Sequence, residues 1–414
     1  MKTSKYKSYS SSKADWLLEK PEHWEMIRLR HLVEIKKNIA NELGYPVLSI
    51  TKDGIKVKNI ESNEGQLSSD YSKYQKVDVD DFAMNHMDLL TGYVDLSKDL
   101  GVTSPDYRVF SIKKDSKLEK RFLLKVLQNA YLQKIFYGYG QGSSKLGRWR
   151  LTKTNFLDFL VPCPPKEEQL LIANFIDKES IKIKDLIAKQ EHLLEVFKKK
   201  ITALALYAYN SNNPKYLRIG NIVEVISRPV QINPKDKYRS LGLFNKGRGL
   251  FHKPIRKGTD MGASNFFYVK PGDLILSGQF AWEGAVAIAG EEEEGCVVSH
   301  RFPILKGNEN YCITEFLQAF FWSTHGNFLL NQNSRGSAGR NRPLNLDLLL
   351  KEKIAIPSIE IQTQIKLLTK QLKTLSEKCQ VQKSLFLERK SALIASGITG
   401  QIDIRNMNTR DITS

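Results

Sequence analysis

The stretch that decides the fold is residues 169–204, which read QLLIANFIDKESIKIKDLIAKQEHLLEVFKKKITAL. Apolar side chains recur there at alternating steps of three and four residues. This spacing, sustained over four or more heptads, predicts a coiled-coil seam. We therefore expect one helix of about 35–40 residues, a rod on the order of 55 Å long. Glu179 and Gln190 interrupt the seam, whose apolar positions are Ile172, Ile176, Ile183, Leu186, Leu193, Phe197 and Leu204.

A second stretch near the C-terminus has the same spacing. Gln382 and Arg389 interrupt it, and its apolar positions are Ile365, Leu368, Leu372, Leu375, Cys379 and Phe386. Two ordinary amphipathic helices, each lying on its own domain, are the alternative interpretation. Two matched helices pair most simply with each other, and they pair antiparallel if each leads back to its partner's module.

The whole chain reads as two copies of one module. Residues 76–85 align with 268–277, Gly92 with Gly284, and Gln169–Ile172 with Gln362–Ile365. Each copy has a strand-rich part, a short helix predicted at 118–135 or 313–330, a Gly/Ser/Arg loop, a strand ending at proline, and a long helix. The copies span roughly residues 1–210 and 211–414.

We expect an α+β fold in which two tandem strand-rich modules with small helices are joined by two long helices forming an antiparallel coiled coil. The predicted boundaries are a first module at 1–163, a central helical region at 164–210, a second module at 211–357, a C-terminal helical region at 358–405 and a tail at 406–414.

The charge of the chain indicates a polyanionic partner. It has 414 residues, with 63 Lys and Arg against 45 Asp and Glu, a formal net charge of +18. Nucleic acid is the usual partner of such a field, and an anionic membrane surface is the second. No apolar run reaches the roughly 18 residues that a membrane span needs. The four cysteines are not paired as Cys-x-x-Cys, so we expect small buried hydrophobes in a reducing cytoplasm.

The catalytic inventory is almost empty. The sequence has no Gly-x4-Gly-Lys-Ser/Thr phosphate loop, and the Glu-x-Lys of 388–390 lies in the second long helix. Asn213-Pro-Lys-Tyr216 approaches the turn with which amino-methyltransferases grip a flipped base. A linker turn is the better interpretation, and a standalone DNA adenine methyltransferase is the alternative.

Basic loops occupy equivalent places in the two copies, at 142–150 and 333–342, with a third at 245–257. Glycines there allow close backbone approach to a groove, serines donate to phosphate, and arginines can read guanine bidentately. Solubility loops, or a basic coiled-coil scaffold that meets acidic proteins, are the alternatives. The predicted DNA-binding residues are Ser143, Ser144, Lys145, Arg148, Arg150, Lys246, Arg248, Arg335, Ser337, Arg340 and Arg342.

Four ordered motifs, spanning nearly the whole chain, resemble the specificity (S) subunit of type I restriction–modification enzymes. They are Asp15-Trp-Leu17 with Pro21-Glu-His-Trp24, Gly101-Val-Thr-Ser-Pro-Asp-Tyr107, Pro164-Pro-Lys-Glu-Glu-Gln169 with Ile172, and Leu387–Ile394 with Gly397-Ile-Thr-Gly400. The second copy departs from this pattern: it has Pro357-Ser-Ile-Glu-Ile-Gln362, Val298-Ser-His-Arg-Phe302 and an opening without tryptophan at Tyr216–Gly220.

The resemblance implies a non-catalytic subunit with no cofactor of its own, in the cytoplasm of a bacterium or archaeon. Each module would be a target recognition domain that reads half of a bipartite, asymmetric site in double-stranded DNA, while the helices set the spacer. Two modification (methyltransferase) subunits would dock beside the helices, and restriction subunits would join them. S-adenosylmethionine, ATP and Mg²⁺ would be bound by those partners. No membrane partner is implied.

Overall fold

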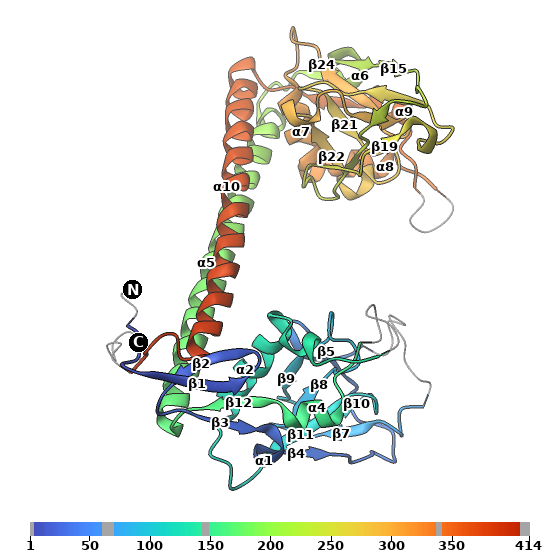
Figure 1. The fold of residues 1–414 in the computed structure, drawn as a ribbon. Coiled ribbons are helices and arrows are strands. Elements are labelled where there is room, and N and C mark those ends of the chain that lie inside the picture. Colours follow the sequence, from blue (N-terminus) through green and yellow to red (C-terminus); the bar gives the residue numbers. More distant parts are fainter. Residues whose placement is uncertain (1–3, 60–69, 143–148, 337–341, 406–414) are drawn as a thin grey trace. The chain divides into compact units, whose positions relative to one another are not determined.

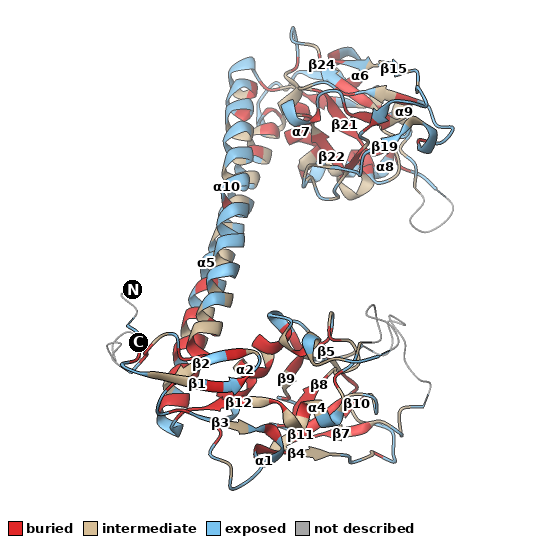
Figure 2. Ribbon diagram, in the orientation of Figure 1, coloured by how far each residue is buried: buried red, intermediate tan, exposed pale blue. Residues whose placement is uncertain are grey.

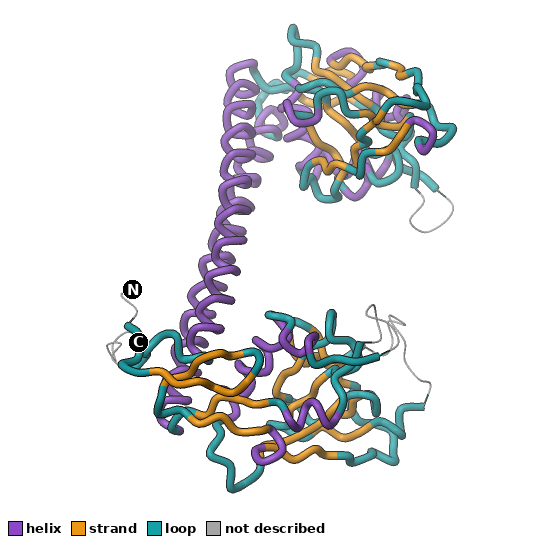
Figure 3. The backbone as a smooth tube through the Cα atoms, viewed as in Figure 1, coloured by secondary structure: helices purple, strands orange, loops and turns teal. Residues whose placement is uncertain are grey.

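The computed structural model of the chain describes residues 4–59, 70–142, 149–336 and 342–405. It divides into two compact units. Unit 1 comprises Met1–Ile187 and Gln382–Ser414, and unit 2 comprises Ala188–Val381. The helices α5 (Lys166–Ala205) and α10 (Ile359–Ile398) run without interruption, and each contributes one end to each unit (Figures 1 and 3).

Unit 1 is rich in short strands. Outside the long helices its elements are, in chain order, β1 (Tyr9–Ala14), β2 (Leu17–Pro21), β3 (Glu25–Arg28), α1 (Leu29–Leu32), β4 (Val33–Lys36), β5 (Leu48–Thr51), β6 (Gly54–Val57), β7 (Gln75–Val77), β8 (Phe82–Met84), β9 (Val94–Leu96), β10 (Gly101–Thr103), β11 (Arg108–Ile112), α2 (Lys120–Leu132), α3 (Ile135–Gly138), α4 (Lys153–Asp158) and β12 (Leu160–Cys163).

Unit 2 contains a similar series. Its elements are η1 (Tyr207–Asn210), β13 (Tyr216–Arg218), α6 (Ile219–Ile222), β14 (Val223–Ile226), β15 (Pro229–Val230), β16 (Lys237–Tyr238), β17 (Leu241–Leu243), β18 (Leu250–His252), β19 (Arg256–Lys257), η2 (Gly258–Asp260), β20 (Phe266–Tyr268), β21 (Leu274–Leu276), η3 (Ala281–Glu283), β22 (Val286–Ile288), η4 (Glu291–Glu293), β23 (Val297–Ser299), β24 (Ile304–Gly307), α7 (Thr314–Trp322), α8 (Thr324–Gln332), α9 (Leu346–Lys351) and β25 (Lys353–Ala355).

The two units share one sheet topology. Unit 1 has a four-stranded antiparallel sheet in the order β4-β11-β8-β9, and unit 2 has one in the order β14-β24-β21-β22. In both, a strand near the start of the module pairs with the strand that precedes the next long helix: β3 with β12, and β13 with β25. This common topology supports the internal repeat inferred from the sequence.

A helix covers each sheet and completes its core. In unit 1, α2 contacts β9, and its Phe122 lies in one buried cluster with Phe82 and Phe110, whose rings stack 4.8 Å apart. In unit 2, α7 contacts β22 and β24 and buries Phe316 and Phe320. All five phenylalanines are buried, and Figure 2 colours the buried segments of the ribbon red. The four cysteines are also buried, as expected.

The long helices pair antiparallel. In the core of unit 1, Ile172 and Ile176 near the start of α5 lie with Ile394 and Ile398 at the end of α10. In the core of unit 2 the opposite ends meet, because Ile201 of α5 lies in one cluster with Ile365 of α10. The start of each helix therefore packs with the end of the other, which confirms the predicted fold class.

The predicted seam of α5 is wrong at two positions, whereas Phe197 and Leu204 pack on the core of unit 2 as predicted. Leu186 and Leu193 are 45% and 48% exposed, whereas Ile187, Gln190 and Leu194 are half-buried. A step of four from Ile183 to Ile187 continues the packed face, because a helix has 3.6 rather than 3.5 residues per turn. Glu179 and Gln190, the polar residues that interrupt the predicted seam, also lie on this packed face. The predicted positions of α10, by contrast, are all buried or half-buried.

The helix predicted at 313–330 is two helices, since α7 ends at Trp322 and α8 begins at Thr324. Ser323 between them has an extended backbone, its hydroxyl donates to Phe320 O (2.6 Å), and its oxygen accepts from Gly326 N (3.1 Å). Serine in this position caps the new helix and ends the old one. The helix predicted at 118–135 is α2, which ends at Leu132.

One buried glutamine fixes each long helix to its module. Gln169 is fully buried; its Oε1 accepts from Glu119 N (2.7 Å), and its Nε2 donates to Lys117 O (3.1 Å) and Pro164 O (2.8 Å). Gln362 makes the matching set in unit 2, accepting from Ile313 N (2.8 Å) and donating to Tyr311 O (3.2 Å) and Pro357 O (3.0 Å). We call each set a glutamine clamp.

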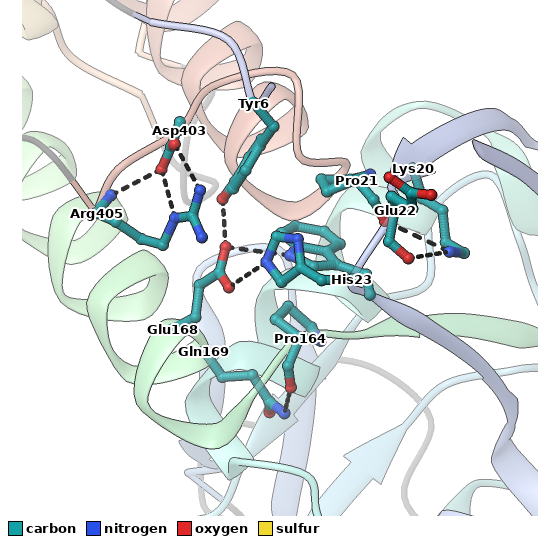
Figure 4. A network of polar contacts seen from close by, with 11 residues as sticks. Tyr6, Lys20, Pro21, Glu22, His23, Pro164, Glu168, Gln169, Asp403 and Arg405 are labelled. Atoms are coloured by element: carbon teal, nitrogen blue, oxygen red, sulfur yellow. Dashed lines mark hydrogen bonds and ion pairs between the residues drawn. The ribbon is translucent and has the colours of Figure 1, made fainter. Parts of the chain in front are cut away.

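A second polar cluster joins the two ends of the chain within unit 1 (Figure 4). The buried carboxylate of Glu168 accepts from Tyr6 Oη (2.5 Å) and Trp24 Nε1 (3.1 Å), and its other oxygen lies 2.8 Å from His23 Nε2. Arg405 is paired with Asp403 (2.8 Å) and lies over the Tyr6 ring, 4.8 Å from its centroid. Residues near both termini therefore pack on the start of α5.

We predict that each clamp stabilises its own unit. Gln169→Ala leaves one N–H and two carbonyl oxygens buried without their partner, so the free energy of opening of α2 should fall by about 2–4 kcal/mol. Gln362→Ala should do the same to α7. Native-state hydrogen exchange measures both. The exposed Gln371→Ala on α10 serves as the control, and unchanged protection in α2 after Gln169→Ala would contradict the prediction.

Candidate nucleic-acid interface

In unit 2, Lys246 and Arg248 lie in the hairpin loop between β17 and β18, and both are exposed. The loop turns through Lys246 and Gly247, which both have a φ of 61°. Arg248 Nε donates to Asn245 O (3.0 Å), and its guanidinium lies 5.0 Å from the centroid of the Phe244 ring. The loop therefore exposes two cationic side chains, and contacts within the loop hold its backbone in place.

Helix α5 supports this hairpin through a lysine that the sequence analysis did not single out. Lys198 Nζ donates to Lys246 O (2.9 Å) and lies 4.5 Å from the centroid of the Trp322 ring. Burial lowers the pKa of Lys198. The long helix thus contacts the loop that carries the candidate DNA-binding residues of this unit.

The second basic loop of unit 2 closes at a bridge between Ser334 and Leu344. Arg342 at its base is half-buried; it donates to Asn331 Oδ1 (2.6 Å) and Ser334 O (3.1 Å) and lies 5.1 Å from the centroid of the Trp282 ring. Arg335 is exposed, with Nε donating to Gln332 O (3.4 Å). Arg342 therefore braces the loop, whereas Arg335 is presented to solvent. Ser337 and Arg340 lie outside the described residues.

The equivalent loop of unit 1 closes at a bridge between Gln141 and Arg150. Trp149 Nε1 donates to Tyr137 O (2.8 Å), and Arg150 is exposed. The other candidates in this loop, Ser143, Ser144, Lys145 and Arg148, lie outside the described residues. Of the eleven predicted residues, Arg150, Lys246, Arg248, Arg335 and Arg342 can thus be placed.

In each unit the end of the basic loop is hydrogen-bonded to an equivalent turn between two strands. Leu151 N donates to His86 O (3.0 Å) in unit 1, and Leu344 N donates to Gly278 O (2.8 Å) in unit 2. The turns are β8–β9, residues 85–93, and β21–β22, residues 277–285. The matching contacts show that the basic loops occupy equivalent structural positions.

A half-buried histidine, His86, lies at the base of the unit 1 loop, where its carbonyl oxygen accepts from Leu151 N. Burial, with the positive charges of Arg108 and Arg150, lowers the pKa of His86 to about 4. No described residue hydrogen-bonds its Nδ1. Arg108 is itself buried, donates to Leu151 O (3.1 Å) and stacks on Phe156. The loop base is therefore positively charged and holds a neutral imidazole at pH 7.

The described residues offer little chemistry of other kinds. No group of three or more His, Cys, Asp or Glu side chains that could hold a metal ion occurs among them. Tyr216 of the methyltransferase-like turn lies in β13, with its ring edge-on to Tyr209. No helix within the described ranges is long and apolar enough to cross a membrane.

Residues 21–196 match the model of a known family, the type I restriction modification DNA specificity domain. This segment of the chain is similar to such a domain. It runs from the end of β2 into α5, so it includes the basic loop at 142–150 and the clamp residue Gln169. The resemblance to the specificity-subunit family is confirmed. A search of curated proteins finds no match to the sequence.

One solved structure shares the fold, and two others are reported with it. A chain from a study of complex assembly and conformational transition in the type I R-M system is 14% identical, with a TM-score of 0.57 over 92% of this chain and 99% of that one. The HsdS subunit from Thermoanaerobacter tengcongensis is 13% identical, with a TM-score of 0.46 over 92% of this chain and 98% of that one. The type I restriction-modification S subunit from M. genitalium is 14% identical, with a TM-score of 0.42 over 91% of this chain and 96% of that one.

We predict that His86 makes the specificity domain acid-sensitive. Its pKa is lower in the folded chain than the ordinary 6.5, so its contribution to stability is complete above pH 6.5. That contribution is lost as the pH falls from 6.5 to about 4, and it amounts to about 3 kcal/mol. His86→Gln should flatten the pH dependence of unit 1 unfolding across this window, whereas the exposed His192→Gln should not. Equal slopes in wild type and His86→Gln would refute the assignment.

Proposed function

We propose that this chain is the sequence-specific DNA-binding subunit of a type I restriction–modification enzyme. Each unit would serve as a target recognition domain for one half of a bipartite, asymmetric DNA site. The observation that carries this proposal is that two units of one topology each hold a basic loop at the same structural position. A duplex read at two separate places needs such a pair of modules.

The residues of the loops suit base readout. Arg150, Arg248 and Arg335 are exposed, and arginine side chains bind guanine bidentately in the major groove. The net charge of +18 adds attraction to the phosphates. The loops differ in sequence between the units, and Trp149 of one corresponds to no tryptophan of the other. Different loops favour different half-sites, which explains an asymmetric target.

The helix pair suits a role in spacing and assembly. α5 and α10 each span 40 residues, and α5 supports the Lys246 hairpin through Lys198. In the proposed enzyme these helices set the spacer between half-sites and dock two modification subunits, which restriction subunits join. S-adenosylmethionine, ATP and Mg²⁺ would be bound by those partners, and the complex would act in the cytoplasm of a bacterium or archaeon.

The direct test is to co-express the chain with its modification subunit and to map methylated adenines in host DNA. We expect methylation at a two-part asymmetric motif with a fixed spacer, and none when the chain is omitted. Methylation at a single uninterrupted motif would contradict bipartite reading. Calorimetry of the isolated chain should show no S-adenosylmethionine binding, whereas binding would favour a standalone methyltransferase.

A second prediction concerns one loop. Arg248→Ala should weaken binding to the cognate duplex by about 1–3 kcal/mol and relax the preference at one base position in one half-site. Arg218→Ala, an exposed arginine of β13 in the same unit, is the matched control. Binding is measured with cognate and single-substitution duplexes over a range of salt concentrations. An unchanged base preference with an unchanged salt slope would remove Arg248 from the interface.

A further inference from the structure

In unit 2 the β21–β22 turn lies between the two basic loops and is bonded to both. Gly278 O accepts from Leu344 N (2.8 Å) at the base of one loop. Glu283 O accepts from Lys246 N (2.8 Å), and Gly284 O accepts from Gly247 N (2.7 Å), in the other. The turn is therefore a direct neighbour of both basic loops.

The turn is also held from within. Phe280 N donates to Ser277 Oγ (3.1 Å), and Trp282 Nε1 donates to Gln279 O (3.1 Å). Ala281 is fully buried, and Gly284 ends the turn with a φ of 72°. The Glu283 carboxylate accepts from the Asn245 amide. The position of the residue at the tip, Phe280, is thus set by the backbone before any ligand binds.

The exposed side chains here are aromatic and cationic. Phe280 is 38% exposed and Phe244 is 39% exposed. Arg342 lies over Trp282 and Arg248 lies over Phe244, so two arginines flank the turn on aromatic faces. An apolar ring among cations on a surface proposed to meet DNA suits an apolar partner on the duplex.

The major groove offers one such partner, because the C5-methyl of thymine is the apolar group among the base edges exposed there. We propose that Phe280 is a specificity-determining residue that contacts a thymine methyl in the half-site read by unit 2. This inference rests on the proposed function and deepens it, since it assigns a base preference to a named side chain.

The corresponding turn of unit 1 lacks this feature. By the register that aligns Gly92 with Gly284, the counterpart of Phe280 is Asp88. The Asp88 carboxylate accepts from Leu90 N (2.9 Å) and Thr91 N (3.3 Å), so it caps its own turn. The methyl contact should therefore occur in one half-site and not in the other.

The test uses the full chain co-purified with its modification subunit and a duplex in which deoxyuridine replaces thymidine, one position at a time. This exchange removes the methyl group and keeps the base pair. For the wild type we expect one position, in the half-site whose preference Arg248→Ala changes, where uracil weakens binding about fourfold, as for one buried methyl-sized group.

Phe280→Ala should bind thymine and uracil duplexes equally at that position, while its uracil sensitivity elsewhere and its melting temperature stay unchanged. Phe280→Leu, which keeps an apolar side chain, should retain part of the difference. Val225→Ala, an exposed apolar residue of β14 in the same unit, is the matched control and should behave as wild type.

The outcomes separate this inference from the proposed function. If the wild type binds a two-part site but no thymine in the unit 2 half-site is sensitive to uracil, the inference falls and the proposed function stands. The same holds if Phe280→Ala keeps the wild-type sensitivity. If the wild type selects no two-part duplex, the proposed function falls and this inference falls with it.

Discussion

The architecture depends on one buried side-chain amide in each unit. A long helix can organise a module only if its start is fixed in position, and Gln169 and Gln362 supply this by bonding three backbone groups each. The amide suits the task because it donates and accepts at once, whereas a carboxylate has no proton to give to the two carbonyl oxygens. Each clamp ties the helix to the segment leading into α2 or α7, and those helices cover the four-stranded sheets of the two units.

The residue before each clamp accounts for two of the sequence differences between the copies. In unit 1 the residue before the clamp is Glu168, which accepts a hydrogen bond from Trp24. In unit 2 the residue before the clamp is Ile361, and the opening of that module has no tryptophan. Unit 2 therefore lacks both the donor and the acceptor of the hydrogen bond that joins Trp24 to Glu168 in unit 1. The clamp is kept in both copies, whereas the Glu168 cluster is a feature of unit 1 among the described residues.

Much of the fold could be predicted because its signals are periodic or repeated. The apolar spacing located both long helices, and the register of Gly92 with Gly284 marked equivalent turns. The seam phase beyond Ile183 was not predictable, since Leu186 and Ile187 both extend the pattern and only packing selects between them. The break at Ser323 depends on a local cap that an apolar helix pattern hides.

The candidate site was predictable in composition and not in detail. Glycine and arginine marked the basic loops, and five of their residues are placed at loop bases or tips, but Arg342 is engaged in bracing, which the sequence could not show. Phe280 and Trp282 were missed because a turn with aromatic side chains resembles a buried strand end. The available signal was their position in the register beside Gly284.

The division of the chain has a consequence for biosynthesis. Unit 2 is a single uninterrupted stretch, whereas unit 1 needs residues from both ends of the chain, including Tyr6 and Arg405. Domains generally fold as units while the ribosome is still synthesising the chain. The interior unit can complete its core before translation ends, but the N-terminal unit must wait for the last helix to emerge. A nascent chain therefore exposes an unfinished first module until the residues from Gln382 to Arg405 have emerged.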